Sequence, residues 1–305
     1  MIFRFTTTLA WVLFLLLFAV LPPLMAQAIP EAIRLTHVHG LFFSADGTRL
    51  QIPGHRGIAA FEGGRWTRAP GSDSDFAGFS AARGVWFASG HPGLTADATD
   101  VLGLGRSTDS GKTWQTVGFA GESDFHYLAA GYRSEVLYLF NPSVNATMPQ
   151  PGLYRSLDLG AQWHRAAAKG LTGEITRLAA HPDESAMVAV GTSSGLYLSR
   201  DGAENFEKMS GEQRVFSVAV EPSGNAIWYG TYNKRARLLV KSLMPKSAER
   251  EIALPTMHGD SVAYIAFNPV VKDEMAISTA RRNVFVSRNK GKDWIQIVHE
   301  GETNG

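Results

Sequence analysis

Histidine and acidic side chains recur in short phrases along the chain, and they are the residue types here that could do chemistry. Imidazole and carboxylate groups bind divalent transition metals, and paired carboxylates can hydrolyse glycosidic bonds. His37 and His39 stand two residues apart in "HVHGL", a spacing that puts both imidazoles on one side of a β-strand. The other candidates of these types are His55, Asp75, His91, Asp124, His126, Glu174 and His258.

Arginine side chains in the second half of the chain add positive charge to this set. Arg214 stands at the start of an apolar run, whereas Arg235 and Arg281 stand in the turn-like phrases "NKRAR" and "STARRN". We expect all three on the same face of the molecule as the histidines. A surface rich in arginine and histidine suits a peptide, a protein segment or a small anionic or sugar ligand.

These residues leave three functions open. The first, which we favour, is a non-catalytic binding or assembly module. The second is a metal-binding protein in which a divalent transition metal is held by His37, His39, His91 and His126. The third is a glycoside hydrolase whose catalytic carboxylates come from Asp75, Asp124 and Glu174. The predicted ligand-binding residues are His37, His39, His55, His91, His126, Arg214, Arg235, His258 and Arg281.

The elements that must position these side chains are short β-type runs separated by Gly, Pro, Asp and Ser. A motif punctuates the runs four times, as "STDSGKTW", "SLDLGAQW", "SRDGAENF" and "SRNKGKDW". Its copies start at residues 107, 156, 199 and 287, and weaker units fit near residues 60 and 243. A repeat of about 45 residues with four short strands is typical of a propeller blade. The spacing therefore predicts an all-β, six-bladed β-propeller over residues 29–305.

The repeated motif predicts a hairpin between the third and fourth strands of a blade. Its Ser and Asp side chains can hydrogen-bond the turn amides, its Gly can take a positive φ, and its Trp can pack between blades. We therefore assign it a structural role, which includes Ser107, Asp109, Gly111, Trp114, Ser156, Asp158, Gly160, Trp163, Asp201, Gly291 and Trp294.

The motif resembles the Asp-box of the BNR repeats found in sialidases, sortilin-type receptors and photosystem II assembly factors. The phrases "HVHGL", "SDFAGF", "ASGHPG" and "GESDFH" resemble a bacterial family of exported six-bladed BNR propellers that is labelled glycosyl hydrolase. This resemblance implies the propeller fold and leaves catalysis open. The Arg-Ile-Pro motif of sialidases is missing near the N-terminus, which speaks against a sialidase.

The predicted propeller separates the two kinds of motif. Loops that enter the first strand of a blade, and loops between its second and third strands, open on one face, so the Asp-box hairpins are expected on the opposite face. Strict alternation along the first strands would set His37, Asp75, Asp124, Glu174 and Arg214 at one level of the channel. Two residues further on come His39, Ala77, His126, Thr176, Phe216 and Ala263.

The N-terminus predicts export. A positive charge in "MIFR", an apolar run of about 16 residues and a small-residue "AQA" site are typical of a signal peptide over residues 1–28. The run is short of the roughly 20 residues of a spanning helix, and the alternative is a retained N-terminal anchor. With no cysteine and a net charge of +1, the chain is expected to be a periplasmic or secreted monomer that does not bind nucleic acid.

Overall fold

The computed structural model describes residues 33–69, 74–93, 101–244 and 247–303. The predicted signal peptide, residues 1–28, lies outside the described residues. Within those ranges the chain forms strands and no helix, and so no described helix is long and apolar enough to cross a membrane.

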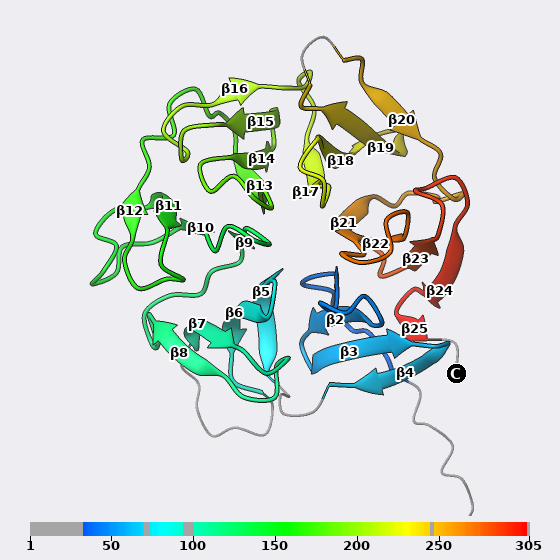
Figure 1. The fold of residues 1–305 in the computed structure, drawn as a ribbon, viewed down its shortest axis with the longest axis horizontal. Coiled ribbons are helices and arrows are strands. Elements are labelled where there is room, and N and C mark those ends of the chain that lie inside the picture. Colours follow the sequence, from blue (N-terminus) through cyan, green and yellow to red (C-terminus); the bar gives the residue numbers. More distant parts are fainter. Residues whose placement is uncertain (1–32, 70–73, 94–100, 245–246, 304–305) are drawn as a thin grey trace, which may run out of the picture. The chain divides into compact units, whose positions relative to one another are not determined.

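Six antiparallel sheets surround a central axis, with the first strand of each sheet innermost (Figure 1). The first blade consists of β1 (Phe42–Phe43), β2 (Leu50–Gly54), β3 (Gly57–Glu62) and β4 (Arg65–Arg68). The second consists of β5 (Asp75–Ala82), β6 (Val85–His91), β7 (Gly103–Ser107) and β8 (Gln115–Gly118). The third consists of β9 (Leu128–Ala130), β10 (Leu137–Asn141), β11 (Gly152–Ser156) and β12 (His164–Arg165).

The remaining three blades repeat this order. The fourth consists of β13 (Ile175–Ala180), β14 (Val188–Thr192), β15 (Gly195–Ser199) and β16 (Glu207–Lys208). The fifth consists of β17 (Val215–Val220), β18 (Ala226–Asn233), β19 (Arg235–Ser242) and β20 (Arg250–Ile252). The sixth consists of β21 (Val262–Phe267), β22 (Met275–Thr279), β23 (Val284–Ser287), β24 (Ile295–His299) and β25 (Glu302–Thr303). The predicted all-β fold with six blades is confirmed.

The hydrophobic core lies between the blades. Six clusters of buried side chains are described, and each joins two neighbouring blades. Between the second and third blades, for example, Phe87 packs with Leu137 and Leu139, all at most 1% exposed. Both faces of most sheets are covered in this way, and the second and third strands are buried over nearly their whole length, as in β2, β14, β15 and β22.

The segments that carry the repeated motif are held by hydrogen bonds of their own side chains. Ser107 ends β7, and its Oγ accepts a hydrogen bond from the Gly111 amide at 2.9 Å. Asp109 accepts a hydrogen bond at Oδ1 from the Thr113 amide at 2.9 Å. The last copy has Asn289 in place of the aspartate, and its Oδ1 accepts from the Asp293 amide at the same distance. A side-chain amide oxygen therefore suffices at this position.

The glycines of the same segments fit against the preceding blade. Gly160 has a φ of 96°, and a Cβ there would lie 2.8 Å from Val117 Cγ1 of the second blade. Gly291 has a φ of 81°, and a Cβ there would lie 2.6 Å from Ile252 Cγ2 of the fifth blade. The hairpin tips therefore contribute to the contact between neighbouring blades.

A β-bulge recurs where the first strand of a blade pairs with the second. The register shifts between Phe76 and Gly78, Ile175 and Arg177, Val215 and Ser217, and Val262 and Tyr264. One extra residue therefore stands in the first strand of four blades, and the alternation of side chains shifts by one after it. The extra residues are those that strict alternation placed at the second level of the channel: Ala77, Thr176, Phe216 and Ala263.

The ring closes between the first and sixth blades. The amide of Leu35 donates a hydrogen bond to the carbonyl of Gly301 at 2.8 Å, and Arg34 forms a β-bridge with Glu302. The same two residues form an ion pair, with Arg34 Nε 2.8 Å from a Glu302 carboxylate oxygen. Two short segments from opposite ends of the described chain thus hold the ring shut.

Ser107→Ala should lower the melting temperature, because the buried Gly111 amide would lose its acceptor. An unsatisfied buried amide costs about 1–3 kcal/mol, which corresponds to a fall of about 2–10 °C for a domain of this size. Asp109→Asn is the matched control, since it keeps the acceptor oxygen that Asn289 supplies in the last copy. Thermal denaturation measures both, and an equal fall in the two variants would contradict this account.

Candidate functional site

Three imidazoles of the first blade lie together at the start of its strands. His37 and His39 precede β1, and His39 is fixed there because its amide donates to the carbonyl of Pro53 at 2.9 Å. His55 lies in the tight turn between β2 and β3. Gly54 permits this approach, because a Cβ at that residue would lie 2.5 Å from the carbonyl oxygen of His37.

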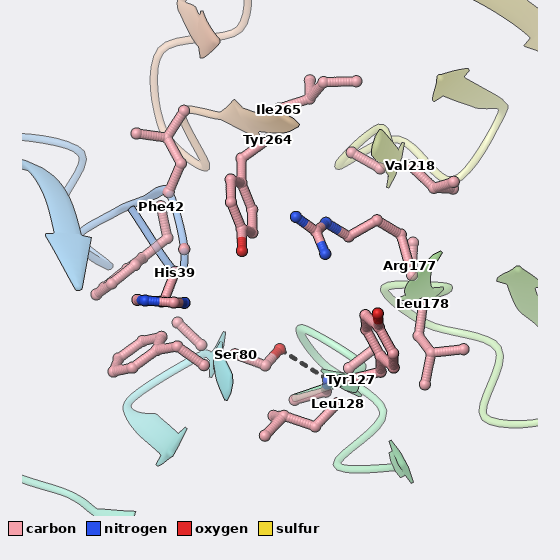
Figure 2. Close-up of a pocket in the computed structure, with 18 of the residues that line it drawn as sticks. His39, Phe42, Ser80, Tyr127, Leu128, Arg177, Leu178, Val218, Tyr264 and Ile265 are labelled. Atoms are coloured by element: carbon pink, nitrogen blue, oxygen red, sulfur yellow. Dashed lines mark hydrogen bonds between the residues drawn. The ribbon is translucent and has the colours of Figure 1, made fainter. Parts of the chain in front are cut away.

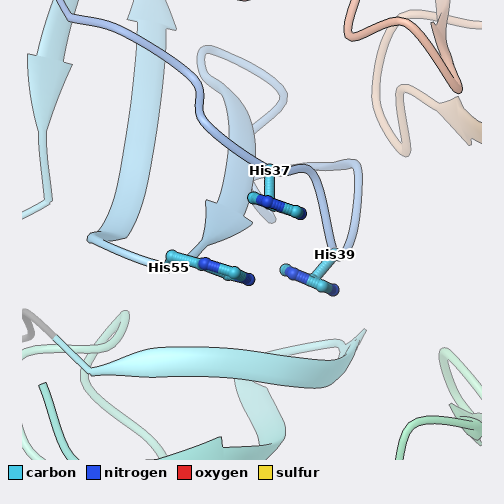
Figure 3. A group of neighbouring side chains, drawn as sticks. All are labelled: His37, His39 and His55. Carbon is cyan, nitrogen blue, oxygen red and sulfur yellow. The ribbon is translucent and has the colours of Figure 1, made fainter.

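The three rings are nearly parallel (Figure 3). The ring centroids of His37 and His55 are 3.9 Å apart at an interplanar angle of 3°, and those of His39 and His55 are 4.9 Å apart at 7°. One nitrogen from each ring lies within 4.8 Å of one nitrogen of the other two. In the part of the chain that the structure describes, no other set of three metal-binding side chains is this close.

Two of the first-blade imidazoles, His37 and His39, are held in their neutral form. Burial and the neighbouring His55 lower the pKa of His39 to about 4. Burial also lowers the pKa of His37, and the charges of His55 and Arg282 act in the same direction. At neutral pH these two rings therefore offer free nitrogen lone pairs.

A second group joins the second and third blades. The carboxylate of Asp124 lies between two imidazoles, with Oδ2 3.1 Å from His126 Nε2 and 3.3 Å from His91 Nε2. Ser89 fixes the loop that carries Asp124, because its Oγ accepts the Phe125 amide at 2.8 Å. Asp124 is only 15% exposed at its side chain, so this carboxylate is held rather than free in solvent.

This second group carries charge at neutral pH. Burial acts to raise the pKa of Asp124, but the hydrogen bond from His126 and the charges of His126 and His91 outweigh it and leave the pKa lowered. The same hydrogen bond with Asp124 raises the pKa of His126 above its ordinary value. A carboxylate with a lowered pKa and an imidazole with a raised pKa therefore stand beside the neutral rings of His37 and His39.

Asp75 links the two groups. Its Oδ1 lies 3.6 Å from His55 Nε2, and in the β5–β6 ladder Asp75 is directly opposite His91. The four predicted metal-ligating histidines are accordingly divided, with His37 and His39 in the first group and His91 and His126 in the second. His55, which was predicted only to bind ligand, completes the first group.

The other predicted residues lie on the fourth to sixth blades and have partners of their own or face solvent. Arg214 forms an ion pair with Glu174 at 3.9 Å, Arg235 with Glu251 at 2.7 Å, and Arg281 with Glu300 at 3.6 Å. His258 is exposed before β21. The structure therefore brings together the candidates of the first three blades. It does not bring Arg214, Arg235, His258 or Arg281 to them.

The central channel contains a cavity of about 200 Å³ lined by the first strands of all six blades (Figure 2). His39 and His126 line it together with Arg177 and Tyr264, which the sequence reasoning missed. The guanidinium of Arg177 stacks over the Tyr264 ring at 4.2 Å, and its Nη1 donates to the carbonyl of Thr176 at 2.9 Å. Both residues directly follow a β-bulge, which is the reason that strict alternation passed over them.

A wider cavity of about 320 Å³ adjoins this one, and Arg177 and Tyr264 line both. Its wall also includes His37 and Arg282, whose Nη1 donates to the carbonyl of Thr36 at 3.2 Å. Among the residues that the structure describes, no carboxylate lies within 4.0 Å of Arg177 or Arg282. The mouth of the channel, defined here by His37, Arg177, Tyr264 and Arg282, thus holds two unpaired cations.

Comparison with known proteins yields matches in structure only. No family model and no curated protein sequence matches the chain. A GH74 enzyme from Niastella koreensis matches 87% of the chain at 14% identity with a TM-score of 0.58. The extracellular domain of BT4673, a one component system from B. thetaiotaomicron, matches 88% at 15% identity with a TM-score of 0.54. YCF48 bound to D1 peptide matches 87% at 15% identity with a TM-score of 0.50.

These matches confirm the predicted resemblance to BNR-type propellers at the level of the fold. The chain spans 46% of the GH74 enzyme and 34% of the BT4673 domain, but 83% of YCF48. At identities of 14–15% they carry no residue of a site from one protein to another.

Asp124→Asn should lower the pKa of His126, because the hydrogen bond with the Asp124 carboxylate is the main cause that raises it. The ring resonances of His126, followed by NMR as a function of pH, should titrate at lower pH in the variant than in the wild type. His164 is the control, since its Nε2 lies 3.1 Å from the carboxylate of Glu204, on another part of the propeller. An unchanged His126 titration would contradict the assigned pairing.

Proposed function

We propose that this protein is an exported, non-catalytic binding module that holds a peptide or another anionic ligand at the mouth of its channel. The observation that carries the proposal is the pair of arginines, Arg177 and Arg282, which line a cavity of about 320 Å³ and have no carboxylate partner among the described residues. Eight other arginines, among them Arg133 and Arg235, form ion pairs with acidic residues. A bidentate carboxylate would satisfy either free guanidinium.

The strand order supports the placement of this site opposite the Asp-box hairpins. Successive connections in an antiparallel sheet lie at alternate ends of the strands. His55 lies between the second and third strands of its blade, and His91 ends a second strand. The Ser107–Trp114 segment connects third to fourth strands. We therefore assign ligand binding to the face that carries His55 and His91, and a scaffolding role to the face that carries the Ser107–Trp114 segment.

The fold is compatible with this use. YCF48, whose structure contains a bound D1 peptide, shows that a propeller of this kind can hold a peptide. Removal of residues 1–28 on export, and a periplasmic or secreted monomer as the product, complete the proposal.

A glycoside hydrolase is the alternative function for the same face, and the charges of the site speak against it. The general acid of such enzymes needs a raised pKa, whereas the pKa of Asp124 is lowered. Glu174 is exposed and paired with Arg214 outside the two histidine groups.

The proposal predicts that replacing Arg177 or Arg282 weakens ligand binding. Wild-type protein should retain a peptide or protein from a periplasmic extract, and the partner, once purified, should bind with saturable heat in calorimetry. Arg177→Gln and Arg282→Gln should each weaken that binding about tenfold or more, since hydrogen bonds to charged groups are worth about 1.5–3 kcal/mol. Arg235→Gln is the control, because Arg235 is already paired with Glu251.

Equal binding by the wild type, the two mouth variants and the control would contradict the proposal, as would retention of nothing by the wild type.

Chromogenic glycosides provide the second test. We expect no turnover by the wild-type protein under conditions in which a reference glycosidase is active. Turnover that Asp75→Asn and Asp124→Asn both abolish would overturn the non-catalytic assignment and establish the alternative.

A further inference from the structure

We propose that His37, His39 and His55 form a binding site for one divalent transition metal ion, at the edge of the channel mouth. This inference is independent of the ligand proposed above, since it rests on the three first-blade histidines and not on the arginines. The described chain contains no other trio of potential ligand atoms this close together.

The strongest observation is the environment of His39. Its side chain is half-buried, and its Nε2 is a buried nitrogen that has no hydrogen-bond partner among the described residues. A buried polar atom without a partner costs stability and calls for an explanation. One nitrogen of His37 and one of His55 lie within 4.8 Å of one nitrogen of His39, which is either Nε2 or Nδ1. An ion bound between the three rings would satisfy that nitrogen.

The local backbone is built to bring the rings together. The amide of His39 donates a hydrogen bond to the carbonyl of Pro53, two residues before His55. This bond holds the segment before β1 against the β2–β3 turn. Gly54 is required there, since any Cβ would meet the His37 carbonyl. The contact between the rings is therefore a consequence of the backbone rather than of flexible side chains meeting by chance.

The rings must turn to bind one ion. The lone pair of an imidazole nitrogen lies in the plane of its ring. The rings of His37 and His55 are stacked, with centroids 3.9 Å apart and an interplanar angle of 3°, so their lone pairs do not point at one common ion position. His37 is exposed and the His55 side chain is 38% exposed, so both can rotate about their side-chain bonds. His39 is the fixed member around which the other two would rearrange.

The ligand types select the metal class. Neutral imidazoles suit zinc, copper, nickel and iron rather than magnesium or calcium, which prefer oxygen. The carboxylate of Asp75, 3.6 Å from His55 Nε2, supplies negative charge beside the ion and can orient His55. Three protein nitrogens would leave one position of a tetrahedral ion open.

Zinc titration of chelator-treated protein tests the site. Isothermal calorimetry should show one Zn²⁺ per chain, and Co²⁺ in its place should give the visible absorption of a tetrahedral site. His55→Ala and His39→Gln should each weaken Zn²⁺ binding by more than about 100-fold. Asp75→Asn should weaken it by the roughly 10–100-fold that loss of an orienting carboxylate costs.

His164→Ala and His299→Ala are the matched controls, because both histidines are exposed on outer strands of other blades. Both controls should bind Zn²⁺ as the wild type does. Melting curves without metal show whether each variant is folded. His55 is a turn residue, so the fold should tolerate His55→Ala. The proposal is overturned if the wild type shows no saturable binding, if folded His55→Ala binds like the wild type, or if the controls lose binding equally. Loss of peptide binding with metal binding intact would affect only the function proposed above.

Discussion

Packing between neighbouring blades is the constraint on which the rest of the structure depends. A single sheet cannot cover its own hydrophobic faces, and it buries them against the sheets on either side. Six apolar clusters fill the six junctions, so no blade can shift without disturbing two of them. This rigidity fixes the inner strands around the channel, and with them the side chains that the loops at one end present.

The fold was predictable because its signal is local and repeated. The Asp-box hairpin is a short segment with its own hydrogen bonds, as Ser107 and Asp109 show, and its spacing reports the length of a blade directly. The same count places His55 and His91 near equivalent connections of adjacent blades, but in the structure His55 lies with His37 and His39, whereas His91 lies beside Asp124.

The missed residues share a physical cause. Arg177 and Tyr264 line the channel because a β-bulge adds one residue before each of them, and a bulge depends on pairing with the next strand rather than on local alternation. At the "ARR" phrase, Arg281 was selected, yet it pairs with Glu300, whereas Arg282 lines the cavity. Which of two adjacent arginines is neutralised depends on a partner 18 to 19 residues away in the chain, and no local pattern reports that.

The closure of the ring gives the histidine site an unusual relation to the ends of the chain. Leu35 is bonded to Gly301, and His37 follows two residues later, so the seam and the first imidazole belong to one short segment. Any change in the contact between Leu35 and Gly301 therefore acts on the segment that carries His37 and His39. One segment, residues 34–39, therefore both closes the ring and carries the first two imidazoles.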